Sequence, residues 1–278
     1  MKKSKAAIIL GTAAAVTTAV VTPLMVYQNR TIQATEYTFR SPKVTGALEG
    51  YRITVVADLH GEHYGKHNEK LLRMIEKQQP DLIVLPGDLT DSYAERTQTA
   101  LDFAKEVVKI APCRFTTGNH EHRLPLHQLN AFLSELEQDG IGVLRNEAEQ
   151  HGAGSEHFRL IGMDCNAAKG KKLLELMRDR PSDELNILLS HKPHFAENYE
   201  ASGVDLVICG HAHGGQFRLP LIGGLYAPGQ GILPKYTAGM YRLGQTVMAV
   251  SRGVGNSSFP VRLGNQPELI TVILRRSK

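Results

Sequence analysis

Two histidines one residue apart follow an apolar stretch in this 278-residue chain. His211 and His213 stand in "CGHAHGGQ", directly after "VDLVI". Imidazole nitrogens are common metal ligands, and glycines beside them let the backbone approach a bound ion closely. Because polar residues also follow other apolar runs of the chain, a metal site built from several strand ends is the first hypothesis.

Four further apolar runs end in side chains with oxygen or nitrogen donors. Ligands of open α/β sheets bind beyond the carboxyl ends of the strands, so these ends can converge on one site. Residues i and i+2 of an extended segment point the same way, so we expect each closely spaced pair to aim in one direction if the chain stays extended there. The donors are Asp58 and His60 in "ADLH", Asp88 and Asp91 in "GDLTD", Asn119 and His120 in "GNHE", and His191 in "SHKP".

The donor types indicate which ions the site would hold. Carboxylates and imidazoles without a thiolate favour Mn, Fe or Zn. Seven protein ligands are too many for one ion that must also accept substrate, so we expect two divalent ions about 3.5–4 Å apart, sharing a carboxylate. Their excess positive charge would attract an anion such as phosphate. The seven ligands are Asp58, His60, Asp88, Asn119, His191, His211 and His213.

Strand-like and helix-like stretches alternate from about residue 50 onward. Apolar runs such as "YRITVVADLH" and "PDLIVLPGDLTD" predict strands, whereas "NEKLLRMIEK" and "LHQLNAFLSELEQDG" have apolar residues at helical spacing. This alternation predicts an α/β architecture with largely parallel pairing. The later runs "TVMAVSRGVG" and "ELITVILRR" suggest a second sheet packed on the first.

Composition excludes two classes of protein. The formal net charge is +4, and no basic block interleaved with aromatic residues is present, so a nucleic-acid partner is not expected. The three cysteines are isolated along the chain and form neither a disulfide framework nor a CxxC metal motif.

The N-terminal residues predict a membrane anchor. After three lysines in "MKKSK", the run 6–27 carries no charge and is long enough to cross a bilayer. The alternative is a cleaved signal peptide of a secreted protein. We expect an anchor over 1–30, a polar linker over 31–50 and a catalytic domain over 51–278. Lysines before the span place the domain on the extracytoplasmic side of the cell membrane.

The ordered motifs resemble the calcineurin-like metallophosphoesterase superfamily. Its pattern of D-x-H, G-D-x-x-D, G-N-H-[ED], a lone His and G-H-x-H stands here as "DLH", "GDLTD", "GNHE", His191 and "GHAH". The resemblance implies two mixed β-sheets packed face to face and flanked by helices. It also implies two divalent metal ions and hydrolysis of a phosphoester by a metal-bridging hydroxide.

Roles for individual residues follow from the same resemblance. Asp58, His60 and His213 would hold one ion, and Asp88 would bridge to a second. Asn119, His191 and His211 would complete that second site. His120 would act as general acid or stabilise the transition state, oriented by Asp91. Arg123 and Lys192, close to the motifs, are candidates for holding phosphate or for ordinary surface charges.

Longer matches such as "GHAHGGQFRLP" resemble a membrane-anchored branch that includes UDP-2,3-diacylglucosamine diphosphatase-type enzymes. They imply phosphodiester or diphosphate hydrolysis on a membrane- or lipid-associated substrate. Alternatives are a phosphomonoesterase or phosphoprotein phosphatase on the same fold, or a non-catalytic metal-binding module. UDP-linked precursors lie on the cytoplasmic side, so either the substrate is an external phosphoester or the predicted orientation is reversed.

Overall fold

The computed structural model describes residues 22–23, 25–91, 93–178, 180–256, 259 and 261–277. Within them, two six-stranded sheets form the framework. In the first sheet, β2, β3, β4 and β5 run parallel, while β16 pairs antiparallel with β2 and parallel with β1. Its order is β1 (Gln33–Ser41), β16 (Glu268–Arg276), β2 (Arg52–Val55), β3 (Leu82–Pro86), β4 (Cys113–Thr116) and β5 (Gly142–Val143).

The second sheet has a parallel centre and antiparallel edges. Strands β15, β9, β8 and β7 run parallel, and β14 and β6 pair antiparallel at the two sides. The order is β14 (Gly239–Leu243), β15 (Thr246–Val250), β9 (Leu206–Cys209), β8 (Asn186–Leu189), β7 (Glu156–Gly162) and β6 (Glu147–Ala153). The predicted second sheet is confirmed, although β16 returns to the first sheet and β7 to β9 supply the centre of the second.

Alternating side chains of the strands build separate cores on the two faces of each sheet. Val55 and Val84 of the first sheet pack between the sheets with Leu189 and Ile208 of the second. On the outer face of the first sheet, Phe115 packs in the core that helices α2, α3 and α4 cover. Helices α5 and α6 cover the second sheet. The helices are α2 (Glu69–Lys77), α3 (Ala94–Val107), α4 (Leu126–Gln138), α5 (Lys172–Met177) and α6 (Ala196–Ser202).

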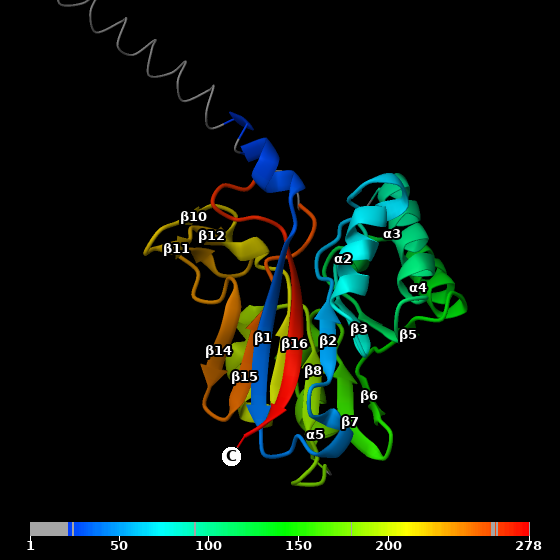
Figure 1. Ribbon diagram of the computed structural model, residues 1–278, viewed down its shortest axis with the longest axis vertical. Coiled ribbons are helices and arrows are strands. Elements are labelled where there is room, and N and C mark those ends of the chain that lie inside the picture. Colours follow the sequence, from blue (N-terminus) through cyan, green and yellow to red (C-terminus); the bar gives the residue numbers. More distant parts are fainter. Residues whose placement is uncertain are drawn as a thin grey trace, which may run out of the picture.

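Two short hairpins project from one end of the molecule, next to the helical residues 25–30 (Figure 1). The first pairs β10 with β11 and the second pairs β12 with β13. Helix α5 lies toward the opposite end in the same view. The hairpin strands are β10 (Arg218–Leu219), β11 (Gly223–Gly224), β12 (Tyr226–Ala227) and β13 (Gly231–Ile232).

The segment 31–50 differs from the predicted polar linker. Residues 33–41 form β1, which pairs along its whole length with β16. Its side chains alternate between exposed and more buried positions at the sheet edge, and Phe39 and Ser41 near its end are buried. Such an edge strand carries many polar residues on its exposed face, which hides it from a hydropathy pattern. The catalytic domain therefore includes residues before position 51.

Most of the predicted membrane anchor lies outside the described residues, which begin at position 22. None of the helices formed by the described residues has the length and apolar character that a membrane crossing needs.

Candidate metal centre

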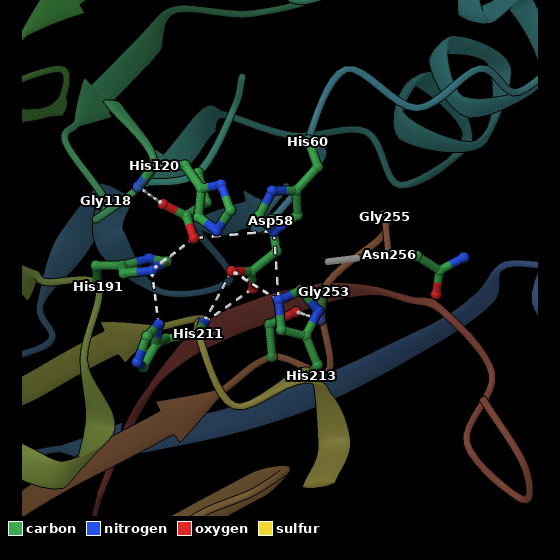
Figure 2. Close-up of polar contacts among 12 residues, drawn as sticks. Asp58, His60, Gly118, His120, His191, His211, His213, Gly253, Gly255 and Asn256 are labelled. Atoms are coloured by element: carbon green, nitrogen blue, oxygen red, sulfur yellow. Dashed lines mark hydrogen bonds and ion pairs between the residues drawn. The ribbon is translucent and has the colours of Figure 1, made fainter. Parts of the chain in front are cut away.

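The predicted ligands come from strand ends in both sheets. Asp58, Asp88 and Asn119 follow β2, β3 and β4 of the first sheet, whereas His191 follows β8 and the pair at 211 and 213 follows β9 of the second. Because these parallel strands end at the same edge, their side chains meet there, as Figure 2 shows for most of them.

Asp58, His60 and His213 form one group of potential metal ligands. One donor atom from each lies within 4.8 Å of the others, and all three residues are buried. The Nε2 atoms of the two histidines are 3.3 Å apart, and His213 Nε2 lies 3.8 Å from Asp58 Oδ1. The three donor atoms therefore lie within reach of one another.

Asp88, His191 and His211 form a second buried group, in which one donor atom of each residue also lies within 4.8 Å of the others. His191 Nε2 lies 3.0 Å from Asp88 Oδ2 and 3.0 Å from His211 Nδ1. His191 Nδ1 donates to the carbonyl of Pro86 at 2.9 Å. Once Nε2 loses its proton, that bond leaves the lone pair on Nε2, which points at the other two ligands.

Asp88 lies between the two groups. Its Oδ2 atom, besides the contact with His191, is 3.8 Å from His60 Nε2 in the first group. Its Oδ1 atom accepts a 2.8 Å hydrogen bond from the backbone N–H of His120. A single carboxylate is therefore held, in a fixed orientation, within reach of both groups.

The backbone at the ligands is not extended, contrary to the expectation for the D-x-H and H-x-H pairs. Asp58, His60, Asp88, His211 and His213 have φ angles between 44° and 66°, in the left-handed region. Such angles cost about 1–3 kcal/mol each and are held by surrounding contacts. Here the N–H of His60 donates to the carbonyl of Asp88 at 3.0 Å, so neighbouring strand ends fix each other's turns. The two side chains of each pair therefore approach the site because the backbone turns between them, and not because it is extended.

Glycines keep the ligand loops close together, as predicted. A Cβ atom on Gly118 would lie 2.2 Å from Asp88 Oδ1, and one on Gly210 would lie 2.4 Å from Asp58 Oδ2. Both distances are far below van der Waals contact. Any residue other than glycine at these two positions would push the carboxylates of Asp88 and Asp58 out of place.

Burial sets the protonation of most ligand histidines. It lowers the pKa of His60 to about 4 and the pKa values of His211 and His213 well below their ordinary value. Burial also acts on the Asp88–His191 pair, but mutual attraction outweighs it and raises the pKa of His191 to about 9, with that of Asp88 held well below its usual range. Three ligand histidines are therefore neutral at pH 7, whereas the fourth is a cation that a metal would deprotonate.

The residues fit a pair of divalent ions. Two nitrogens that bind one ion, each about 2.1 Å away, would lie about 3.0–3.4 Å apart, which matches the nitrogen–nitrogen distances of 3.3 and 3.0 Å in the two groups. Among the described residues, Asn119 Oδ1 is a buried oxygen without a hydrogen-bond partner. A buried amide oxygen without a partner is costly unless something such as a cation completes it.

His120 lies beside the ligands with its ring bonded on both sides. Its Nδ1 is 2.9 Å from Asp91 Oδ1, the predicted orienting partner, and its Nε2 is 3.0 Å from Arg123 Nη1. Its ring centroid is 4.5 Å from that of His60. The structure thus brings His120, Asp91 and Arg123 together at the edge of the first ligand group.

An open cavity of about 670 Å³ lies over these side chains. Asp88, Asn119 and His120 line it on the metal side, together with the two predicted cationic candidates, Arg123 and Lys192. The Nζ of Lys192 also donates to Asn166 at 2.7 Å. Both cations are therefore placed to face an anion in the cavity.

Two buried charged residues support the site in ways that the sequence did not predict. Glu121 accepts hydrogen bonds from the backbone N–H groups of Asp88, Thr90 and Gly118, and so ties two ligand loops together. The motif "GNHE" includes Glu121, but its residue type gives no sign of this role. Burial is the main cause that raises its pKa to about 7.

Arg262 is the second such residue, and it has no motif. Its fully buried guanidinium donates to the carbonyls of Arg252 and Gly255 and lies 3.3 Å from His213 Nδ1. The loop that it holds donates from Gly255 N to the carbonyl of Asp58 at 2.8 Å. Gly253 and Gly255 lie beside Asp58 and His213 in Figure 2. Because Arg262 lies in a glycine-rich stretch and in none of the motifs, its role could not be predicted from the sequence.

His122 and His194 each follow a ligand motif closely in the chain. His194 lines the cavity, and its ring centroid is 5.7 Å from that of His211. His122 bonds Thr117 at 2.9 Å. His194 therefore belongs to the wall of the site.

Comparison with known proteins assigns the class. The model of the family described as calcineurin-like phosphoesterase matches residues 51–215, more than half of the chain, and the chain therefore belongs to this family of metal-dependent phosphoesterases. The chain is 29% identical over 250 residues to the "Uncharacterized metallophosphoesterase YkuE" of Bacillus subtilis, covering 88% of this chain and 86% of that protein. It is 30% identical over 226 residues to "Phosphodiesterase YaeI" of Escherichia coli, covering 79% and 80% respectively.

A solved structure shares the fold at low sequence identity. The Thermus thermophilus sulfate thiohydrolase SoxB superposes with a TM-score of 0.51 at 12% identity. The matched region covers 82% of this chain and 57% of that longer chain. The two-sheet fold implied by the resemblance is confirmed. The match to the family, in turn, makes the protein a hydrolase of phosphoesters.

Proposed function

We propose that the protein is a dinuclear-metal phosphohydrolase that cleaves phosphodiester or diphosphate bonds. The position of Asp88 carries this proposal, because one of its oxygens lies within 3.8 Å of a nitrogen in each of two ligand groups. A shared carboxylate between two groups is the arrangement that two-metal hydrolases use.

In this proposal, Asp58, His60 and His213 hold one ion, and Asn119, His191 and His211 hold the other. When bound, the ions would lower the pKa of water and neutralise charge on the phosphoryl oxygens. Asp88, which contacts both groups, would contribute a ligand to each ion. Its own orientation is fixed by the backbone N–H of His120.

His120 acts on the leaving group or on the developing phosphoryl charge. Asp91 accepts from one ring nitrogen and so fixes the ring's rotation, while Arg123 faces the other nitrogen. A positioned imidazole of this kind supplies about 10²- to 10⁴-fold in rate by proton transfer. Arg123 and Lys192 hold the remaining phosphoryl oxygens from the cavity wall.

We also propose a membrane- or lipid-associated substrate and a single-pass anchor over 1–30 that leaves the catalytic domain outside the cell. The uncharged run 6–27 behind three lysines supports the anchor. The open cavity, which has apolar as well as polar walls, supports the substrate class. Labelling of single engineered surface cysteines from outside intact cells tests the orientation.

Turnover of a small substrate panel by the full chain tests the proposed activity. With Mn²⁺ added, we expect hydrolysis of bis-p-nitrophenyl phosphate and of a UDP-diacylated sugar, and slower hydrolysis of p-nitrophenyl phosphate. Faster hydrolysis of the monoester would favour a phosphomonoesterase instead. Tight metal binding without turnover of any of the three would favour the non-catalytic module.

A further inference from the structure

Exposed large apolar side chains cluster at one end of the molecule. Of the twelve that are exposed among the described residues, nine lie on the hairpins, on the helical residues 25–30 or at Phe259. Ile232 is 81% exposed, and Leu221 is fully exposed. We call these nine the apolar rim. Its members are Val26, Tyr27, Leu219, Leu221, Ile222, Tyr226, Ile232, Leu233 and Phe259.

The segments that carry the rim are joined into one face. Gln28 accepts a hydrogen bond from the N–H of Gly264, and Asn29 bonds both backbone groups of Arg262. The same loop reaches the first hairpin, where the N–H of Arg218 donates to the carbonyl of Leu263 at 2.9 Å. Figure 1 places the helical residues 25–30 and the hairpins at the same end. The rim is therefore a continuous structural unit.

Folding preferences do not account for the exposed side chains. Leu221 and Leu233 have φ angles of 68° and 53°, which are rare for bulky residues. Neither side chain gains core packing in return, since 62% of Leu233 and all of Leu221 are accessible to solvent. An exposed apolar surface of this kind marks a site of interaction.

The rim continues into the catalytic cavity. Tyr226 and Phe259 belong to the rim and also line the cavity, next to Phe217 and Pro228. Asp88 and His120 line the same cavity at its metal side. A molecule with a phosphoester head and an apolar tail could therefore contact the ligands with its head and the rim with its tail.

The charge of this face fits an anionic partner. The run 206–267, which includes both hairpins, has no Asp or Glu. At the chain's average acidic content it would hold about six. Arg30 and Lys235 are exposed beside the rim, and Arg218 is half-buried at the base of the first hairpin. A second copy of the chain docked on the same face would bring these like charges together.

We propose that the apolar rim docks into the surface of an anionic lipid bilayer and that the cavity receives an amphiphilic phosphoester from that bilayer. Apolar side chains flanked by basic residues, on a stretch of chain without carboxylates, are a composition that binds such surfaces. The uncharged run 6–27 leads directly into the rim at Val26 and Tyr27, so the same bilayer is within reach. The substrate part of this inference rests on the proposed phosphohydrolase activity, whereas the docking part does not.

Tryptophan fluorescence tests the docking, because the chain contains no tryptophan. Ile222→Trp and Ile232→Trp each place a single probe on the rim, and Leu174→Trp on α5 is the control, since Leu174 is 47% exposed away from the rim. The full-length variants are placed in vesicles of phosphatidylcholine and phosphatidylglycerol. We expect blue-shifted emission and quenching by brominated acyl chains for the rim probes only.

Rim probes quenched no more than the Leu174 control would overturn the proposal. So would a blue shift that grows with the protein-to-lipid ratio without quenching by brominated chains, because a second copy would then cover the face.

Paired substrates test the delivery of the lipid. The variant Ile222→Ser with Ile232→Ser should hydrolyse vesicle-borne p-nitrophenyl phosphatidate at least about tenfold more slowly, since loss of even one such side chain from lipid weakens partition by about that factor. Hydrolysis of soluble bis-p-nitrophenyl phosphate should be unchanged. Equal loss on both substrates contradicts the proposal. Failure of the native chain on the soluble diester would instead contradict the proposed activity and leave the fluorescence result standing.

Discussion

The metal ligands hold a backbone conformation that residues other than glycine rarely adopt. The motifs were sufficient to predict which side chains converge, because residue types and order are visible in the sequence. They did not predict how, since the left-handed angles at Asp58 and His60 depend on contacts with the loop after β3. The role of Arg262 was invisible for the same reason: its partners are carbonyls that only the fold brings near.

Replacement of His120 by alanine tests the role of this residue in catalysis. We expect His120→Ala to lower kcat for bis-p-nitrophenyl phosphate by about 10²- to 10⁴-fold, because the imidazole at the cavity edge is lost. Metal content should stay at the native level, since His120 is not one of the seven predicted ligands. Unchanged kcat, measured with saturating Mn²⁺, would remove His120 from the mechanism.

Protonation of His191 makes metal binding depend on pH. Its pKa is raised to about 9 in the metal-free protein, so near pH 7 metal must displace a proton from it. We expect about one proton released per chain from this residue, and metal affinity that falls as pH falls. Calorimetric titration with Mn²⁺ in buffers of different ionisation enthalpy measures the release. Metal binding at pH 7 without proton release would contradict the assignment of His191 as a ligand.

At the scale of elements, apolar strands were predictable and polar ones were not. The runs that became β3, β8 and β9 are fully buried in the centres of the sheets, and β2 is buried except for Arg52 at its start, so their hydropathy is unmistakable. Strand β1 is a half-exposed edge, and the hairpins carry their apolar residues outward. The polar residues on the exposed face of β1 hide it from a hydropathy pattern, which is why the linker prediction differed from the structure. The hairpins instead depart from the rule that apolar side chains lie inside.

Close packing of the loops after β3 and β4 predicts a large effect of one methyl group. Gly118→Ala places a Cβ 2.2 Å from Asp88 Oδ1, so we expect a loss of about 1–3 kcal/mol in the free energy of unfolding and weaker metal binding. Gly170→Ala is the matched control, because its Cβ would meet only the carbonyl of Ala167 at 3.6 Å. Urea unfolding of both variants gives the comparison. Equal stability of the two variants would argue against the tight loop contact.

At the scale of the whole molecule, the site joins the two sheets. Ligands from the first sheet and ligands from the second meet at one edge, so bound metal links the two layers directly. We expect chelation to lower the melting temperature by about 5–10 °C for each ion removed. That follows from a binding contribution of about 2.7 kcal/mol at a metal concentration one hundred times Kd. Scanning calorimetry with and without EDTA measures it, and an unchanged melting temperature would contradict a structural link.

The number of divalent ions bound per chain tests the central claim most directly. Elemental analysis of the purified full-length protein, after equilibration with Mn²⁺ and removal of free metal, should give two ions per chain. The Asp88→Asn variant should retain fewer, because the shared carboxylate is lost. A native protein that binds one ion or none under these conditions would contradict the account.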